Sequence, residues 1–180
     1  SMTGWDNVMC IRCPVWPTQA ADWLNRQRQH GWPDIATITT VVNNGCHVVP
    51  VCHRQCKNDE WLRTHQWRLS FSKAETVLLN SWTPIQQIIY HMIRFVVKRE
   101  VFQQDCNYID KDVKLLSNYH LKTLMLWACE LKSSEWWTPL KLVNICSKLL
   151  TVVCCWLQDG KCQHYFITNC NLFDFPQNVK

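Results

Sequence analysis

Glycine is scarce in this sequence, with four residues in a chain of 180. Because glycine adopts positive φ more readily than any other residue, few tight turns of that kind are expected, and a helical body is favoured. Charged residues make up 18% of the chain, which excludes a disordered tail and a coiled coil. No apolar run reaches the roughly 18 residues of a membrane span and no signal peptide opens the sequence, so no membrane contact is expected.

Tryptophan and cysteine are abundant instead, with eleven and twelve residues. A chain of this length buries roughly 70% of its unfolded surface, and large tryptophan rings would fill much of that core. Disulfide frameworks serve small secreted domains that lack a core. Here several cysteines lie inside apolar helical patterns, where a free thiol behaves as a small hydrophobe: Cys129, Cys146, Cys154 and Cys155. We therefore expect a reducing compartment, cytoplasmic or nuclear.

The net charge of +5 permits contact with phosphates but does not demonstrate it, because dedicated nucleic-acid binders are usually more basic. The sequence has no long block of lysine and arginine. A direct nucleic-acid surface therefore ranks last among the functional hypotheses. Its candidate residues are scattered: Arg26, Arg28, Arg54, Lys57 and Arg63.

Capping signals and apolar periodicity predict a mainly α fold, a helical bundle with a short strand remnant at its N-terminal edge. Threonine followed by proline marks two helix starts, at residues 83–84 and 138–139. Asp34 and Gly45 bracket another helix, whose apolar stripe includes Ile35. The run around Pro50 is expected to be irregular or an edge strand. Helices are expected over residues 18–30, 34–45, 73–81, 84 onward, 117–131 and 139–158, after a strand over 4–13.

The segment "WRLSFSKAE", residues 67–75, has the period-2 alternation of a half-buried extended segment, followed by a helix start. Ser72 and Glu75 fit a capping box, in which the serine oxygen accepts from the backbone N–H three residues on. This local explanation leaves Arg68 and Ser70 without a role.

Six segments, in order along the chain, resemble the cyclic GMP–AMP synthase-like receptors, the nucleotidyltransferases that share the male-abnormal (Mab) domain. They are "CPVWP", "GWP", "WRLSFSKAE", "SNYHLKTLMLWACE", "WW" at 136–137 and "HYFITNCNLF". In this family an N-terminal lobe carries three carboxylates that bind two Mg²⁺ ions, and a C-terminal helical lobe closes the nucleotide cleft. The resemblance implies that residues 1–17 are the last strand and turn of a missing nucleotidyltransferase lobe, and that residues 18–180 are the helical lobe.

Asp6 resembles the third metal-binding carboxylate of the family; the alternative is an ordinary residue at a strand end or turn. The other two come as an acid–apolar–acid pair after a Gly-Ser loop, and this sequence contains neither feature. One aspartate cannot form a two-metal site, because Mg²⁺ needs several oxygen ligands and in-line transfer needs both ions. We therefore expect this chain alone to show no nucleotidyltransferase activity.

The resemblance also implies nucleotide contacts. Arg68, Ser70, Ser72 and Glu75 match positions that line the base and ribose, and Tyr119 matches a tyrosine that stacks on a purine. Ser117 and Asn118 match a pair near phosphate, and Arg94 or Lys98 matches a phosphate-binding lysine. The alternatives are structural: capping for Ser72, Glu75 and Ser117, packing for Tyr119, and a solvated helix face for Arg94 and Lys98.

The zinc-binding thumb of the vertebrate DNA-sensing member is absent from the sequence, which puts double-stranded DNA sensing in doubt and leaves RNA or another ligand open. A different cysteine set has zinc-ligand spacing: Cys10, Cys13, Cys52 and Cys56. Burial as a small hydrophobe on the predicted strand explains Cys10 equally well.

Two functions follow from the resemblance. In the first, this lobe closes the cleft of an enzyme that joins nucleoside triphosphates, with cyclic dinucleotide synthesis on nucleic-acid sensing and a role in innate immunity. In the second, the protein is a catalytically silent Mab-domain module that binds a regulatory or protein partner.

Overall fold

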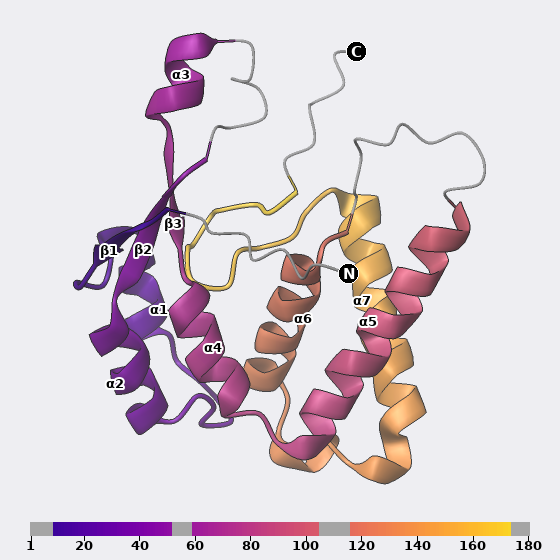
Figure 1. Cartoon of the computed structure of the whole chain (residues 1–180). Coiled ribbons are helices and arrows are strands. Elements are labelled where there is room, and N and C mark those ends of the chain that lie inside the picture. The colour runs from indigo at the N-terminus through magenta and orange to yellow at the C-terminus, as the bar shows by residue number, and fades with distance from the viewer. Residues whose placement is uncertain (1–8, 52–58, 105–115, 174–180) are drawn as a thin grey trace, which may run out of the picture. The chain divides into compact units, whose positions relative to one another are not determined.

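The computed structural model describes residues 9–51, 59–104 and 116–173, and over these ranges the chain is mainly helical with one small sheet (Figure 1). The predicted fold class is therefore confirmed. The chain divides into two compact units. The first combines residues 1–18 with 34–81, and the second combines residues 19–33 with 82–180. Each unit is described by itself.

The sheet of the first unit has three antiparallel strands in the order β1-β2-β3. They are β1 (Ile11–Cys13), β2 (Cys46–Pro50) and β3 (Trp67–Ser70). The prediction that the segment around Pro50 is irregular or an edge strand is wrong, since β2 is the central strand. Pro50 is the last residue of β2 and lies opposite Trp67, so its missing N–H falls at the end of the ladder.

Helix α2 (Ile35–Asn44) has the predicted start and end. The backbone N–H of Thr37 donates to the Asp34 carboxylate at 2.7 Å. Hydrogen bonding from the Thr37 side chain, and next from its backbone N–H, holds the pKa of Asp34 below its usual value. Gly45 ends the helix with φ 63° and ψ −147°, a conformation that is essentially restricted to glycine. The predicted apolar stripe is wrong at Ile35, which is 84% exposed.

Helix α3 (Glu60–His65) precedes β3, and helix α4 (Ser72–Asn80) follows it and packs on α2 and β2. The capping box predicted at Ser72 and Glu75 is wrong, because the helix begins one residue earlier. Phe71 occupies the N-cap position, and the N–H of Glu75 donates to its carbonyl at 2.8 Å. Phe71 is buried against Trp16, with 5.5 Å between the ring centroids. The start of this helix thus coincides with a buried aromatic residue.

In the second unit, a 3₁₀ turn (Thr18–Ala20) leads into helix α1 (Ala21–Asn25), which is shorter than the helix predicted over 18–30. Arg26 is already extended, with φ −64° and ψ 126°. The extended backbone carries the guanidinium groups of Arg26 and Arg28 to the Glu130 carboxylate. The chain thus leaves the helix at Arg26, and both arginines contact a carboxylate of a residue more than 100 positions away along the chain.

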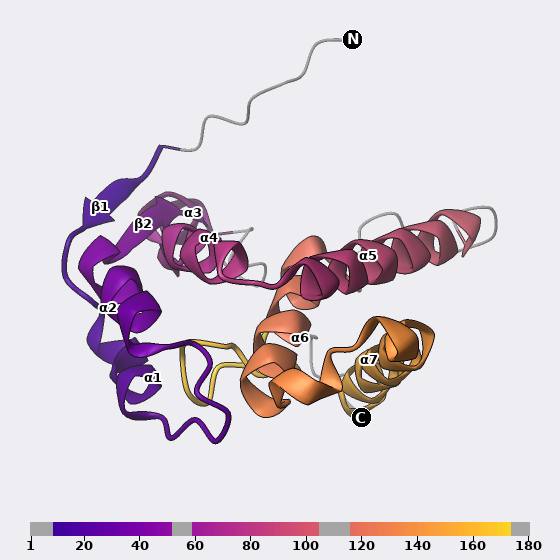
Figure 2. The same cartoon turned by 90° about the horizontal axis from the view of Figure 1, so that it is seen from below.

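Three long helices form the body of the second unit: α5 (Pro84–Gln104), α6 (Asn118–Leu131) and α7 (Leu142–Asp159). All three were predicted from their caps and periodicity. Helix α5 packs against both α6 and α7, as Figures 1 and 2 show. The short 3₁₀ helices η3 (Ser134–Trp136) and η4 (Pro139–Lys141) connect α6 to α7. The predicted inward residues of α6 are buried: Leu121, Leu124, Met125 and Ala128.

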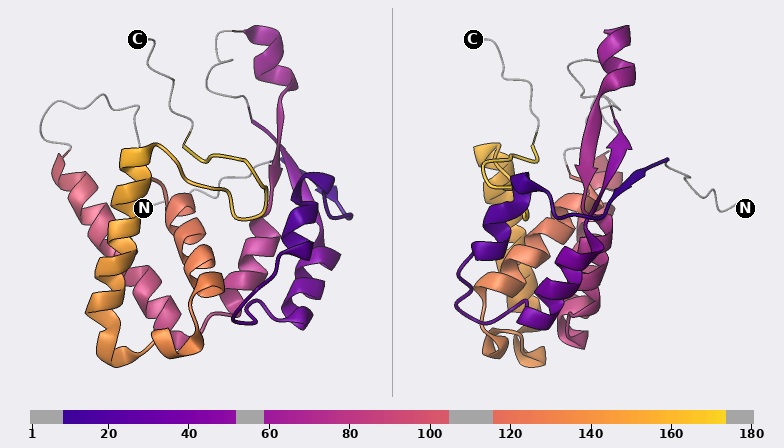
Figure 3. Two further views of the ribbon diagram at one scale, coloured as in Figure 1. Left: turned by 180° about the vertical axis from the view of Figure 1, so that it is seen from behind. Right: turned by 90° about the vertical axis from the view of Figure 1, so that its left-hand side faces the viewer.

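After Gly160 the chain forms an irregular segment that leaves α7 and doubles back, as Figure 3 shows. We call residues 160–173 the C-terminal segment. The Asn171 side chain holds it together: its Oδ1 accepts from the N–H of Cys162 at 2.7 Å, and its Nδ2 donates to the carbonyl of Gly160 at 2.9 Å. The N–H of Leu172 also donates to the carbonyl of Cys162 at 2.7 Å.

The sequence has no unbroken apolar run of membrane length. One helical stretch of the described chain, Pro139–Asp159, is nevertheless long and apolar enough to cross a membrane. Its mean hydropathy is 1.7, and 22% of the window is buried. This is weak evidence, since the core helices of soluble proteins also pass the test.

Candidate functional site

The start of α6 brings together several residues that were predicted to contact a nucleotide. Ser117 is the N-cap, and its N–H donates to Nδ1 of His120 at 3.0 Å. The Ser117 hydroxyl lies 3.1 Å from the same nitrogen. The capping alternative for Ser117 is therefore confirmed, with histidine in the place that glutamate usually takes. Contact between Ser117 and a phosphate stays a prediction.

Arg94 connects α5 to this helix start. Its Nε donates to Oδ1 of Asn118 at 3.1 Å, and its guanidinium carbon lies 5.4 Å from the centroid of the Tyr90 ring. Lys98 lies one turn further along α5 and is exposed. The sequence left Arg94 and Lys98 as alternatives. Arg94 contacts Asn118 of the Ser117–Tyr119 motif, and the choice between the two cations stays a prediction.

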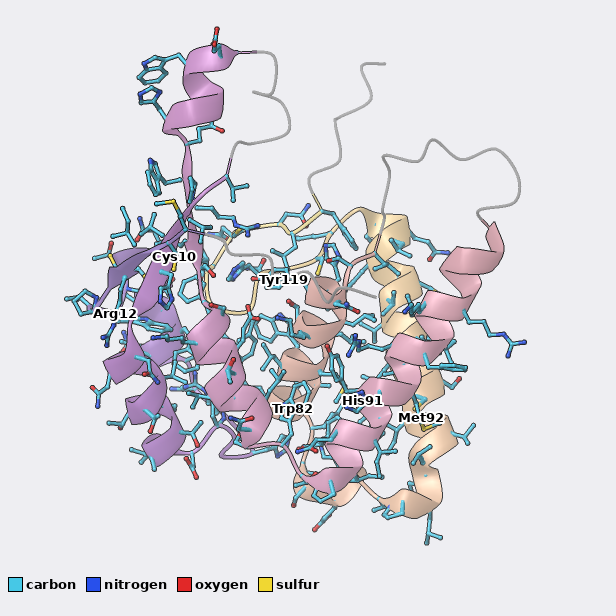
Figure 4. The ribbon with its side chains drawn as sticks, viewed as in Figure 1. Cys10, Arg12, Trp82, His91, Met92 and Tyr119 are labelled. Atoms are coloured by element: carbon cyan, nitrogen blue, oxygen red, sulfur yellow. The ribbon has the colours of Figure 1, made fainter. Side chains whose placement is uncertain are left out.

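Tyr119 is half-buried in the first turn of α6, where Figure 4 labels it. Its hydroxyl oxygen lies 2.9 Å from Nε2 of His164, a residue of the C-terminal segment. The ammonium group of Lys122 lies 5.5 Å from the centroid of the Tyr119 ring, at cation–π distance. The Tyr119 ring thus has one contact at its hydroxyl edge and one at a face, and it is only half-buried.

Sequence reasoning missed both partners of Tyr119. Lys122 could have been found, because residues three apart on a helix are neighbours on its surface. His164 follows from the tertiary fold, since it is 45 residues away along the chain. The motif "HYFITNCNLF" was noted only for its resemblance to the family.

The other predicted contacts belong to the first unit. Arg68 and Ser70 lie two apart on β3 and therefore share one face of the sheet; Arg68 is exposed and Ser70 half-exposed. Ser72 is exposed in the first turn of α4, whereas Glu75 is 6% exposed. All four residues lie within positions 68–75, on β3 and the start of α4. Their roles toward a nucleotide stay predictions.

Of the five predicted metal ligands, two lie within the residues that the structure describes. Asp6, Cys52 and Cys56 lie outside the described residues. Cys10 is exposed beside β1, as Figure 4 shows, and Cys13 lies opposite Cys46 in the sheet. Burial, and next the neighbouring Cys13 thiol, raise the pKa of Cys46. Among the residues that the structure describes, no group of three or more His, Cys, Asp or Glu side chains could hold a metal ion.

A buried ionic cluster in the second unit was not predicted. Nη1 of Arg26 donates to both oxygens of the Glu130 carboxylate at 3.2 and 3.3 Å, and the Tyr165 hydroxyl donates to Oε2 at 2.7 Å. Nε of Arg28 lies 3.5 Å from the same Oε2, an ion-pair distance without hydrogen-bond geometry. Burial, and next the charge of Glu130, hold the pKa of Tyr165 well above its usual value.

These contacts involve two of the candidate nucleic-acid residues, Arg26 and Arg28. The Arg26 guanidinium also donates to the carbonyl of Tyr165 at 2.8 Å and lies 4.5 Å from the Trp127 ring centroid. The Arg28 guanidinium donates to the carbonyl of Trp23 at 2.7 Å. Both groups are therefore used within their own unit.

An apolar groove of about 470 Å³ lies between α5 and α7. Figure 4 shows Met92, one of its lining residues, on the side of α5 that faces α7. Val96, Val143 and Leu150 also line it, whereas Arg94 and Lys98 do not. The groove is thus distinct from the predicted nucleotide residues of α5.

Comparison with known families gives two matches. Residues 6–81 match the Mab-21 protein nucleotidyltransferase domain, and residues 86–179 match the Mab-21 protein HhH/H2TH-like domain. The second match alone covers more than half of the chain. The matched ranges meet between residues 81 and 86, whereas the sequence analysis expected the helical lobe to begin at residue 18; that boundary stays a prediction. The resemblance stated from the six segments is confirmed, and the chain belongs to the Mab-21 family.

Proposed function

We propose that this chain is the helical, cleft-closing part of a nucleotidyltransferase-like receptor and that it binds a nucleoside triphosphate. The hydrogen bond from Arg94 to Asn118 carries the proposal, because it sets a guanidinium beside a helix start. The first backbone N–H groups of a helix have no intrahelical partner and favour an anion such as phosphate. A guanidinium beside the positive end of a helix dipole favours the binding of phosphate there.

In this proposal, the purine stacks on the Tyr119 ring. Arg94 contacts phosphate, helped by Ser117 and Asn118, with Lys98 as the alternative cation. For the other unit we propose separately that Arg68 recognises a base edge in the planar, bidentate way that lysine does not allow. Ser70, Ser72 and Glu75 of the same segment would add contacts to base and ribose. Double-stranded RNA or DNA as activating partner, a cyclic dinucleotide as product, innate immunity and a cytoplasmic or nuclear location belong to the same proposal.

Catalysis is not assigned to the described residues. The family uses Mg²⁺, which needs several oxygen ligands in octahedral geometry. The described part of the chain offers no group of three or more His, Cys, Asp or Glu side chains that could hold a metal, so the described residues do not fit this ion. The described residues can bind and orient a nucleotide, and the 180-residue chain should make no cyclic dinucleotide from ATP and GTP.

The test is a titration of the chain with ATP and GTP up to millimolar concentration, followed by NMR chemical shifts. Base–aromatic stacking is worth about 1–3 kcal/mol, so Tyr119→Ala should weaken binding by roughly 5- to 150-fold. Phe95→Ala is the matched control, since Phe95 is 68% exposed on α5. Binding that Tyr119→Ala leaves unchanged would contradict the proposal.

The second candidate function is a catalytically silent module that binds a protein partner. The apolar groove between α5 and α7 favours it, because clefts lined by apolar side chains are common binding sites. A thermal-shift measurement separates the two functions. No shift at millimolar ATP or GTP favours the module, whereas a shift that Tyr119→Ala abolishes favours nucleotide binding.

A further inference from the structure

His164 has an unusual position for an irregular segment, because it is 7% exposed and hydrogen-bonded through both ring nitrogens. The backbone N–H groups of Phe166 and Ile167 both donate to its Nδ1, at 3.0 Å each. A ring nitrogen that accepts hydrogen bonds carries no proton. In the imidazole ring the proton is therefore on Nε2.

This tautomer fixes the direction of the bond to Tyr119. The Nε2–H group of His164 donates, and the Tyr119 hydroxyl oxygen accepts, across 2.9 Å. A second contact restrains the two rings, whose centroids lie 6.1 Å apart at an interplanar angle of 58°. Since His164 is buried and bound to the backbone on its other side, it is a rigid donor aimed at the edge of a half-buried ring.

We infer that His164 is a positioning residue, which sets the orientation of the Tyr119 ring for stacking on a purine. The inference rests on the proposed function, because it assumes that Tyr119 meets the nucleotide. His164 itself does not touch the ligand in this arrangement. Its two nitrogens have separate tasks: Nδ1 shapes the C-terminal segment, and Nε2–H orients Tyr119.

Two substitutions separate these tasks. Asparagine places a carbonyl oxygen near the position of Nδ1, so His164→Asn keeps the acceptor for the backbone and loses the donor to Tyr119. Glutamine reaches the position of Nε2 with an amide N–H, so His164→Gln keeps the donor and loses the backbone acceptor. We expect His164→Asn to weaken nucleotide binding roughly 2- to 10-fold, the worth of one neutral hydrogen bond, with little loss of stability. His164→Gln should show the reverse: lower stability and nearly unchanged affinity.

A double-mutant cycle with Tyr119→Phe completes the test, because phenylalanine lacks the accepting oxygen. In the Tyr119→Phe background, His164→Asn should cause no further loss of affinity. An independent readout is the ¹⁵N shift of the His164 ring, which should report a protonated Nε2 and an unprotonated Nδ1. A proton on Nδ1 at neutral pH overturns the inference, whatever the binding data.

The outcomes distinguish this inference from the proposed function. If the wild-type chain binds no nucleotide, or if Tyr119→Ala has no effect, both are overturned. If Tyr119→Ala weakens binding but His164→Asn does not, or if His164→Asn has the same effect in the Tyr119→Phe background, only the positioning role is overturned.

Discussion

Replacing Glu130 by glutamine should strongly destabilise the second unit, because that carboxylate is the single acidic group in the observed cluster. The Glu130 side chain is 3% exposed, and the side chains of Arg26 and Arg28 are 20% and 7% exposed. Glutamine keeps the size of glutamate and removes its charge, so two guanidinium groups would remain without a counter-ion. Breaking a buried ion pair from one side costs about 3–5 kcal/mol, and we expect a loss in this range.

The measurement is urea unfolding of wild type and Glu130→Gln, followed by tryptophan fluorescence and far-UV circular dichroism. Glu135→Gln is the control, since Glu135 is exposed in η3. It removes the same charge and should change the free energy of unfolding by less than about 0.5 kcal/mol.

A second arm tests whether the cluster acts as one unit. Tyr165→Phe removes the hydroxyl that donates to Glu130 and should cost about 1.5–3 kcal/mol, as for other hydrogen bonds to charged groups. The double variant should lose less than the sum of the two single losses, because both act on the same carboxylate. A loss below about 1 kcal/mol for Glu130→Gln would refute the argument, since it would mean that water solvates the arginines.

Two further predictions concern the backbone and the thiols. Gly45→Ala should destabilise the protein more than Gly31→Ala. Both glycines have positive φ, which costs an L-residue roughly 1–2 kcal/mol. Only at Gly45 would the added Cβ also collide with the backbone of Cys13 and Pro14. Equal losses in urea unfolding would contradict the collision. Burial raises the pKa of Cys162 to about 12, so its reactive thiolate stays rare until the pH approaches that value. At pH 8, iodoacetamide should therefore modify the exposed Cys154 and Cys155 first. Early modification of Cys162 in a peptide map would contradict its burial.

The sequence predicted those elements whose signals are local. Thr83-Pro84 marked the start of α5, and Asp34 with Gly45 bracketed α2, because caps and prolines act within a few residues. The early end of α1 was not predictable in this way, since the partner of Arg26 is 104 residues away along the chain. The central place of β2 likewise depends on two other strands.

Prediction of the candidate site was limited in the same way, to residues with a local sequence signal. Tyr119 and Asn118 could be identified from a short motif, and Arg94 only as one of two cations on a helix face. The contact that favours Arg94 over Lys98 exists because α5 packs on α6. At Ser72 a local capping rule gave the wrong answer, because the helix begins one residue earlier, with the buried Phe71 at the N-cap.

The C-terminal segment reaches α6 along much of its length. Its contacts run from Leu172, near His120, to Tyr165, which is bonded to Glu130, and the Trp127 indole donates to the carbonyl of Gln163 at 3.1 Å. The rings of Tyr165 and Phe166 also cover Trp23, a fully buried residue of α1. A truncation at the end of α7 would therefore remove side chains that pack on one side of the core. A shorter version of the protein for crystallisation should keep the chain through Phe173.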